Sequence, residues 1–296
     1  YEFTYSTVNP DYNFKGSDWW GTYKENADNS CAYSDNLSNA DYPYTEQDYT
    51  TAKSNASAWN LTEIKLPSGG KIKIEYESDD YAYIQDRQAM NMVKIAGFGP
   101  SSDIGSYATK TFEKDCLAIT THPIVYFNLN TAITGTNAKE DFYRQYLNGL
   151  KELQFTVFAN IDNAGNYEFV KGYADIDYDK GYGLVNNGST GWVALKRVKI
   201  GDKKGAHKNR MVNPVTRAIW NFAKLYTPHL THPYGNSSGA EKNQILGLAP
   251  LFNDLRYMVK GFNKTLESKR FGQKIKLAKS WIRVLNPDKK KFGGGH

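Results

Sequence analysis

The segment from Lys71 to Glu77 alternates charged and apolar side chains without a break, and it constrains the fold more than any other part of the chain. Ile72, Ile74 and Tyr76 share one face of an extended backbone, and the charged side chains share the other. A period of two with charges on one side is typical of a half-buried antiparallel strand. We therefore expect the face with the two isoleucines to be buried.

Two β-hairpins are predicted, each from a pair of β-patterned runs joined by a turn that contains glycine. The first pairs 59–66 with 71–77 across Pro67-Ser68-Gly69-Gly70. The second pairs 155–159 with 167–170 across the turn at 162–165. Two later strands are predicted at 192–200 and 274–284.

Helices are predicted in three places. Asn137, with Glu140 three residues later, resembles a capping box and starts a helix near 138–150. Asn213 before Pro214 is an N-cap signal. It starts a helix with one apolar stripe, formed by Val215, Ile219, Phe222 and Tyr226. A third apolar pattern of helical spacing runs over 245–262.

These elements predict a mainly β fold, in which antiparallel hairpins form a large curved sheet or partial β-shell with two or three short helical insertions. Aromatic residues make up 14% of the 296 residues, including 22 tyrosines, which favours β structure. Along the chain we expect three segments: a β-rich segment with long loops at 1–200, a helical insertion at 201–273, and a strand at 274–296.

The charge is too small to indicate a nucleic-acid binder, because the formal net charge is only +6. It is nevertheless segregated: residues 1–50 carry nine acidic and two basic side chains, whereas 255–296 carry twelve basic and two acidic ones. The basic residues are interleaved with Trp281, Ile282 and Val284, which favours the wet face of folded structure. We expect no nucleic-acid partner. No run of 18 apolar residues occurs, so no transmembrane helix is expected.

No motif of known catalytic chemistry is recognisable, because the GxSxG, Walker A and GxGxxG patterns are all missing from the sequence. His229 and His232 form an HxxH pair without the glutamate of a zinc protease, which favours polar loop residues. We therefore expect neither a catalytic residue nor a cofactor.

Three alternating carboxylates, Asp175, Asp177 and Asp179, are the candidates for a metal site. An EF-hand requires glycine at the sixth position and glutamate at the twelfth, where this chain has Lys180 and Asn186. Two interpretations of these carboxylates remain: a calcium site of another kind, or the solvent-exposed face of a strand. Because Lys180 brings a positive charge next to the carboxylates, we expect no bound calcium.

Other candidates are few. Trp19 and Trp20 are the candidates for a ligand-binding platform that stacks on sugars, the alternative being packing within a hairpin. Cys31 and Cys116 are too few for a zinc cluster or a disulfide scaffold, and they form either one disulfide or two free thiols.

The block from Ser57 to Tyr83, including Trp59-Asn60-Leu61-Thr62-Glu63 and Pro67-Ser68-Gly69-Gly70, resembles long Rhs-like (YD-repeat-like) surface proteins of the Bacteroidota. Four further blocks are similar to the same proteins and occur in the same order as in them: 18–21, 43–48, 213–214 and 280–287. Two stretches, Gly70 to Tyr76 and Gly172 to Asp179, approximate a YD repeat. The aspartyl self-cleavage motif of the family is not recognisable, so the resemblance implies no catalytic residue.

The resemblance implies a piece of a very large secreted protein whose hairpins wind into a hollow β-shell. Such shells enclose a C-terminal toxin or display surface modules, and export by the type IX secretion system to the bacterial cell surface is expected. We therefore expect a non-enzymatic structural or encapsulating segment. The alternative is a cell-surface adhesin that binds glycan or a partner protein through Trp19 and Trp20. Expected partners are other segments of the same or an associated polypeptide, secretion-system or outer-membrane proteins, and glycan.

Overall fold

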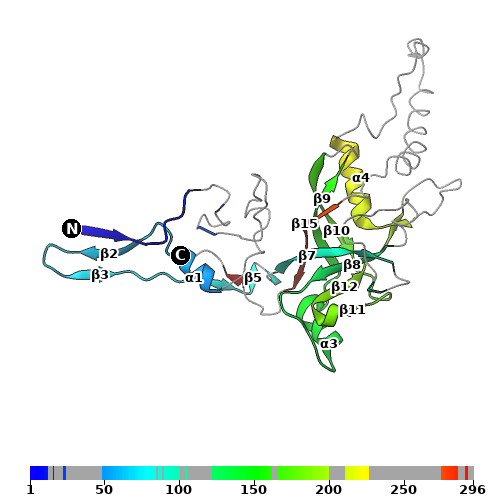
Figure 1. Cartoon of the computed structure of the whole chain (residues 1–296), viewed down its shortest axis with the longest axis horizontal. Helices are drawn as coiled ribbons and strands as arrows, with labels where there is room; N and C mark the ends of the chain where they lie inside the picture. The colour runs from blue at the N-terminus through cyan, green and yellow to red at the C-terminus, as the bar shows by residue number, and fades with distance from the viewer. Residues whose placement is uncertain are drawn as a thin grey trace, which may run out of the picture. The chain divides into compact units, whose positions relative to one another are not determined.

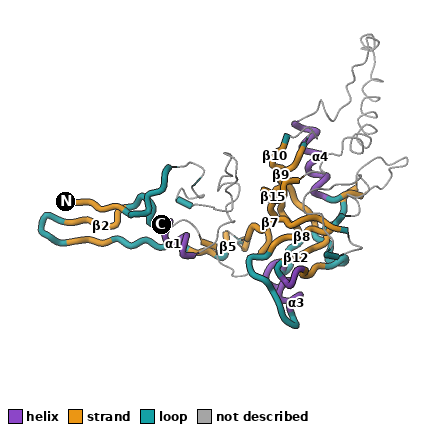
Figure 2. The backbone as a smooth tube through the Cα atoms, viewed as in Figure 1, coloured by secondary structure: helices purple, strands orange, loops and turns teal. Residues whose placement is uncertain are grey.

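The computed structural model describes residues 1–12, 16, 23–24, 49–84, 86–88, 90–100, 104–105, 122–161, 166–199, 211–226, 275–285 and 291–292. They form a mainly β protein with antiparallel sheets and helices of at most 13 residues (Figures 1 and 2), which confirms the predicted fold class. The chain divides into a terminal unit, Tyr1–Met92 with Val284–His296, and a central unit, Val93–Arg283.

The terminal unit contains a three-stranded antiparallel sheet, called the small sheet below, in the order β1-β2-β3. Its strands are β1 (Glu2–Tyr5), β2 (Leu61–Lys65) and β3 (Lys71–Lys73). The other elements among the described residues of this unit are short: α1 (Tyr49–Ala56), the pair β4 (Asp80–Tyr81) and β16 (Lys291–Phe292), and the pair β5 (Tyr83–Ile84) and β6 (Arg87–Gln88).

The predicted first hairpin is confirmed, but the burial predicted for it is wrong. β2 and β3 pair as expected, with Ile64 opposite Ile72. However, β3 ends at Lys73 rather than Glu77, and Ile72 is 48% exposed. The alternation correctly says that the isoleucines share a face. A narrow sheet of three short strands does not bury that face. Further along the chain, Ile74 and Tyr76 are only half-buried as well.

The central unit is built on a seven-stranded sheet in the order β10-β9-β15-β7-β8-β12-β11 (Figure 1). Its strands are β7 (Met90–Gly99), β8 (Ile124–Asn128), β9 (Glu152–Asn160), β10 (Tyr167–Asp175), β11 (Tyr182–Val185), β12 (Thr190–Ala194) and β15 (Ile275–Leu285). The division between the two units falls within β7, after Met92. β15 comes from far along the chain and lies between β9 and β7. A smaller antiparallel pair, β13 (Val198–Lys199) and β14 (Met211–Val212), also belongs to this unit.

The predicted second hairpin is confirmed, because β9 and β10 pair in unbroken antiparallel register from Tyr167 opposite Asn160 to Asp175 opposite Glu152. β15 pairs with the other edge of β9 and contains a β-bulge. Ser280 fills this bulge: its hydroxyl accepts the Phe158 N–H at 3.1 Å and donates to the Lys276 carbonyl at 2.8 Å. One buried serine thus satisfies the backbone groups that the broken ladder exposes.

The helix α4 (Pro214–Tyr226) begins where the sequence predicts and packs against β10 (Figure 1). Asn213 is fully buried, accepts the Val215 N–H at 2.8 Å as an N-cap, and donates to the His122 carbonyl at 2.8 Å. Of the predicted stripe, Val215 and Ile219 are buried, Phe222 is half-buried, and Tyr226 is 67% exposed.

The helix predicted near 138–150 is shorter and less regular than expected. It consists of α3 (Ala138–Phe142), which continues as a π-helical turn at Tyr143–Leu147. Asn137 is the N-cap residue but makes no side-chain cap hydrogen bond, so the predicted capping box is wrong. The apolar stripe holds the segment in place instead, since Phe142 and Tyr146 are fully buried.

Several predictions lie outside the described residues. The predicted segments 1–200, 201–273 and 274–296 are consecutive in the sequence. The two compact units are not, because one of them combines both ends of the chain. Most of 201–273 is not described, including the helix predicted at 245–262. Six candidate residues from the sequence analysis also lie outside the described residues: Trp19, Trp20, Cys31, Cys116, His229 and His232. In the part of the chain that is described, no helix is long and apolar enough to cross a bilayer.

Candidate functional site

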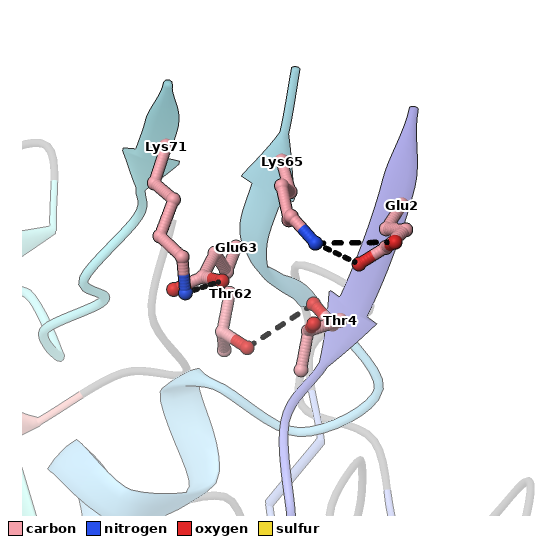
Figure 3. A network of polar contacts seen from close by, with 6 residues as sticks. All are labelled: Glu2, Thr4, Thr62, Glu63, Lys65 and Lys71. Carbon is pink, nitrogen blue, oxygen red and sulfur yellow. Dashed lines mark hydrogen bonds and ion pairs between the residues drawn. The ribbon is translucent and has the colours of Figure 1, made fainter. Parts of the chain in front are cut away.

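The charged face of the small sheet is held by ion pairs that run across all three strands (Figure 3). The Lys65 ammonium on β2 lies 3.1 Å from the Glu2 carboxylate on β1, and the Lys71 ammonium on β3 lies 2.8 Å from the Glu63 carboxylate on β2. The Lys71 hydrogen bond lowers the pKa of Glu63, and the reciprocal interaction with Glu63 raises the pKa of Lys71. Both glutamates on this face are therefore paired with lysines within the sheet.

The opposite face of the small sheet is apolar and open to solvent. Phe3 lies opposite Ile64, which in turn lies opposite Ile72, so these three side chains form a row across the sheet. Phe3 is 58% exposed and Tyr5, two residues further along β1, is 62% exposed. Exposed apolar residues that gather in this way mark an interaction surface more often than scattered ones do.

The backbone groups of β1 alternate between the edge that faces β2 and the opposite, outward edge. The Ser6 N–H donates to the Asn60 carbonyl at 2.8 Å, and the Thr4 carbonyl accepts from the Thr62 hydroxyl at 3.1 Å, so both point toward β2. Backbone groups alternate direction along a strand, which turns the N–H and C=O of Phe3 and Tyr5 away from β2. Within the described residues, no strand pairs with this outward edge of β1.

The three candidate metal ligands are not arranged as one site. Asp175 is exposed at the end of β10, where it lies opposite Glu152. The chain then turns, since the Asp177 carbonyl accepts the Lys180 and Gly181 N–H groups. The Asp177 carboxylate lies 3.6 Å from the Lys180 ammonium, while Asp179 is exposed in the turn. Among the described residues, no group of three or more histidine, cysteine, aspartate or glutamate side chains is placed to hold a metal ion.

A strip of aromatic and lysine side chains lies on β9, β10 and β15 of the central unit. The Phe158 ring is 4.5 Å from Phe169 and 5.4 Å from Tyr167, measured between ring centroids. The Lys276 ammonium lies 4.4 Å from the centre of the Tyr167 ring, and Lys279 lies 4.8 Å from that of Phe158. Because lysines lie over these rings, the strip is a stabilising layer rather than an open stacking platform.

Three tyrosines, Tyr143, Tyr178 and Tyr182, form a second aromatic cluster, with ring centroids between 5.2 and 5.9 Å apart. The Tyr178 hydroxyl donates to the Leu150 carbonyl at 2.6 Å, and its burial raises its pKa to about 12. The Tyr143 hydroxyl accepts the Gly149 N–H at 3.2 Å. These phenols tie the helical segment and the residues after it to the turn before β11.

β1 was not predicted as a strand from the sequence. The sequence does contain the alternation expected of a strand, because Tyr1, Phe3 and Tyr5 alternate with Glu2 and Thr4. A run of five residues is too short for periodicity alone to distinguish a strand from a loop. The pairing with β2, which is distant in the sequence, is what identifies these residues as a strand. No protein-family model, curated protein or solved structure matches this chain.

Proposed function

We propose that this chain is a non-enzymatic structural segment of a large secreted Rhs-like surface or toxin-delivery protein, and that it joins other β-strands through the outward edge of β1. The observation that carries the proposal is made at Phe3, where a backbone turned outward coincides with a side chain that is 58% exposed. Strand addition at a sheet edge supplies main-chain hydrogen bonds and apolar contacts together. The opposite face offers less to a partner, because its ion pairs are already formed.

The antiparallel hairpins β2–β3 and β9–β10 are consistent with the repeated hairpins of Rhs-like shells. The proposal includes export by a type IX secretion system to the surface of a bacterium of the Bacteroidota. Its partners are other segments of the same or an associated polypeptide, and secretion-system or outer-membrane proteins.

The coding sequence on either side of residues 1–296 tests the parent-protein part of the proposal. We expect an adjacent array of YD repeats and a variable C-terminal region. Start and stop codons directly beside this segment would contradict a large Rhs-like parent.

Photo-crosslinking in the parent protein tests the role of β1. A photoreactive amino acid at Phe3 is compared with one at Tyr226, which is 67% exposed on α4. We expect crosslinks from position 3 to an extended segment of the same or another polypeptide, and fewer from position 226. If position 3 crosslinks no more than position 226, β1 is not an assembly edge.

A second candidate function is that of an adhesin module that binds glycan. The observation in its favour is Tyr173, whose side chain on β10 is 66% exposed. Exposed tyrosine rings offer sugars an apolar surface with a polar tip.

A glycan array separates the two functions. The adhesin function predicts binding that is lost in Tyr173→Ala, or in Trp19→Ala or Trp20→Ala, and retained in Tyr226→Ala, whose tyrosine is equally exposed. Array binding that is unchanged in all four variants, or absent from the wild type, would rule out this candidate.

A further inference from the structure

We propose that the partner of β1 is β1 of a second copy of this chain, paired antiparallel around a two-fold axis at Phe3. The inference deepens the proposed function and rests on it, since both use the outward edge of β1. Two small sheets would then join into one continuous six-stranded sheet in the order β3-β2-β1-β1-β2-β3.

The backbone geometry fits this axis. A two-fold axis between antiparallel strands can pass through a hydrogen-bonded pair, in which two opposed residues exchange both N–H···O=C bonds. Phe3 meets that requirement, because its N–H and C=O both face outward. The Tyr5 backbone also faces outward, and with the axis at Phe3 it lies opposite Tyr1 of the second copy, so the ladder extends in both directions.

The side chains are self-complementary in the same register. Phe3 lies opposite Phe3, and Tyr1 lies opposite Tyr5, so the three exposed aromatics of each copy pair with one another. Their exposed fractions in the single chain are 77% for Tyr1, 58% for Phe3 and 62% for Tyr5. Aromatic pairs directly across two strands are among the favourable cross-strand contacts. An isologous interface requires this kind of self-complementarity.

The charges also permit the pairing. With the axis at Phe3, Glu2 lies opposite Thr4 of the second copy rather than opposite another glutamate. The Glu2 carboxylate already has a cation, since Lys65 donates to both of its oxygens at 3.1 and 3.3 Å. No like charges are therefore brought directly opposite each other, which is the arrangement that destabilises strand pairs. On the apolar face, the row Phe3–Ile64–Ile72 of one copy continues into that of the other.

Sedimentation velocity on the 296-residue chain, at protein concentrations from about 1 to about 100 μM, tests the dimer. We expect a concentration-dependent dimer in the wild type and at least tenfold weaker association in Phe3→Pro. Proline at this position removes an N–H that faces outward and spares the ladder to β2. The control is Tyr12→Lys, which changes an aromatic residue that is 84% exposed outside β1 and should leave the association unchanged. A monomer throughout, or a dimer that Phe3→Pro does not weaken, would overturn the proposal.

Cysteine crosslinking tests the register, in a background with serine at positions 31 and 116. Phe3→Cys should crosslink between copies more readily than Thr4→Cys, because a hydrogen-bonded pair holds its two Cα atoms about 5.5 Å apart. Thr4→Cys is the control, since its two copies would be offset by two residues, with Cα atoms about 8 Å apart. Equal crosslinking of both variants, or crosslinking of Thr4→Cys alone, would contradict the axis at Phe3.

The outcomes also separate this inference from the proposed function. If the photoreactive residue at position 3 crosslinks to a different segment of the parent protein and the chain sediments as a monomer, β1 is an assembly edge but its partner is not a second copy. If position 3 crosslinks to nothing and the chain is monomeric, both fail.

Discussion

Phe3 lies opposite Ile64 on the face of the small sheet that carries no ion pair, and its backbone groups point to the edge that β2 does not use. On the other face, Lys65 and Lys71 are both paired with glutamates. The sheet therefore pairs both of its glutamates internally and leaves its aromatic groups and one row of backbone groups for a partner. This division between the two faces is the basis of the proposed assembly role.

Two isoleucines of contrasting exposure should differ in their contribution to stability. Ile72 is 48% exposed on β3, whereas Ile124 is 1% exposed on β8. We expect Ile124→Ala to lower the free energy of unfolding by about 2–5 kcal/mol. Ile72→Ala should cost less than about 1 kcal/mol, because little packing is lost at an exposed site. Denaturant titration of both variants measures the difference, and equal costs would mean that the apolar face of the small sheet is covered.

The exposure of Ile72, at 48%, also shows the limit of what the sequence predicts. Alternation identified the hairpins and the residues that share each face, because a period of two is a local property of the backbone. Whether a face is covered depends on elements elsewhere in the chain, which periodicity does not report. β1 was missed for the same reason, since its role depends on pairing with β2 some 60 residues away, as in Glu2 opposite Lys65.

The buried bulge of β15 predicts a large effect of one hydroxyl group. Ser280→Ala leaves the Phe158 N–H without the acceptor it has at 3.1 Å. An unsatisfied buried donor costs about 1–3 kcal/mol. The matched control is Ser189→Ala, whose hydroxyl donates to the Asn186 carbonyl at an exposed site, and there we expect about 0.5 kcal/mol or less. Equal costs in thermal or denaturant unfolding would show that Ser280 does not support the bulge.

Gly183 on β11 should not tolerate a side chain, because it lies directly beneath the Trp192 indole. A Cβ atom at this position would be 2.9 Å from the indole Nε1, and Trp192 is only 7% exposed. We expect Gly183→Ala to destabilise the protein by about 1–3 kcal/mol. In a Trp192→Leu background the same change should cost less, since the ring is gone. A double-mutant cycle from denaturant titrations checks this, and additive costs would argue against the contact.

The pKa of Tyr178, raised to about 12 from the usual 10.0, predicts a specific dependence on pH. Burial favours the neutral phenol, so the resulting stability is fully present below pH 10 and is lost as the pH rises toward 12. Tyr178→Phe cannot ionise, and its free energy of unfolding should fall less over this interval. Below pH 10 the variant should be less stable by about 1 kcal/mol, because the hydrogen bond to Leu150 is lost. Parallel stability curves for the two proteins between these pH values would contradict the assignment.

The central claim, that the outward edge of β1 is open and pairs with a second copy, is tested most directly by hydrogen exchange at single backbone amides. In dilute protein, at about 1 μM, the Phe3 and Tyr5 amides should exchange rapidly while those of Thr4 and Ser6 are protected by β2. At about 100 μM, Phe3 and Tyr5 should exchange at least tenfold more slowly, with Thr4 and Ser6 unchanged. If Phe3 and Tyr5 exchange equally fast at both concentrations, this edge does not pair with a second copy. If they are already protected in the dilute protein, the edge is not open.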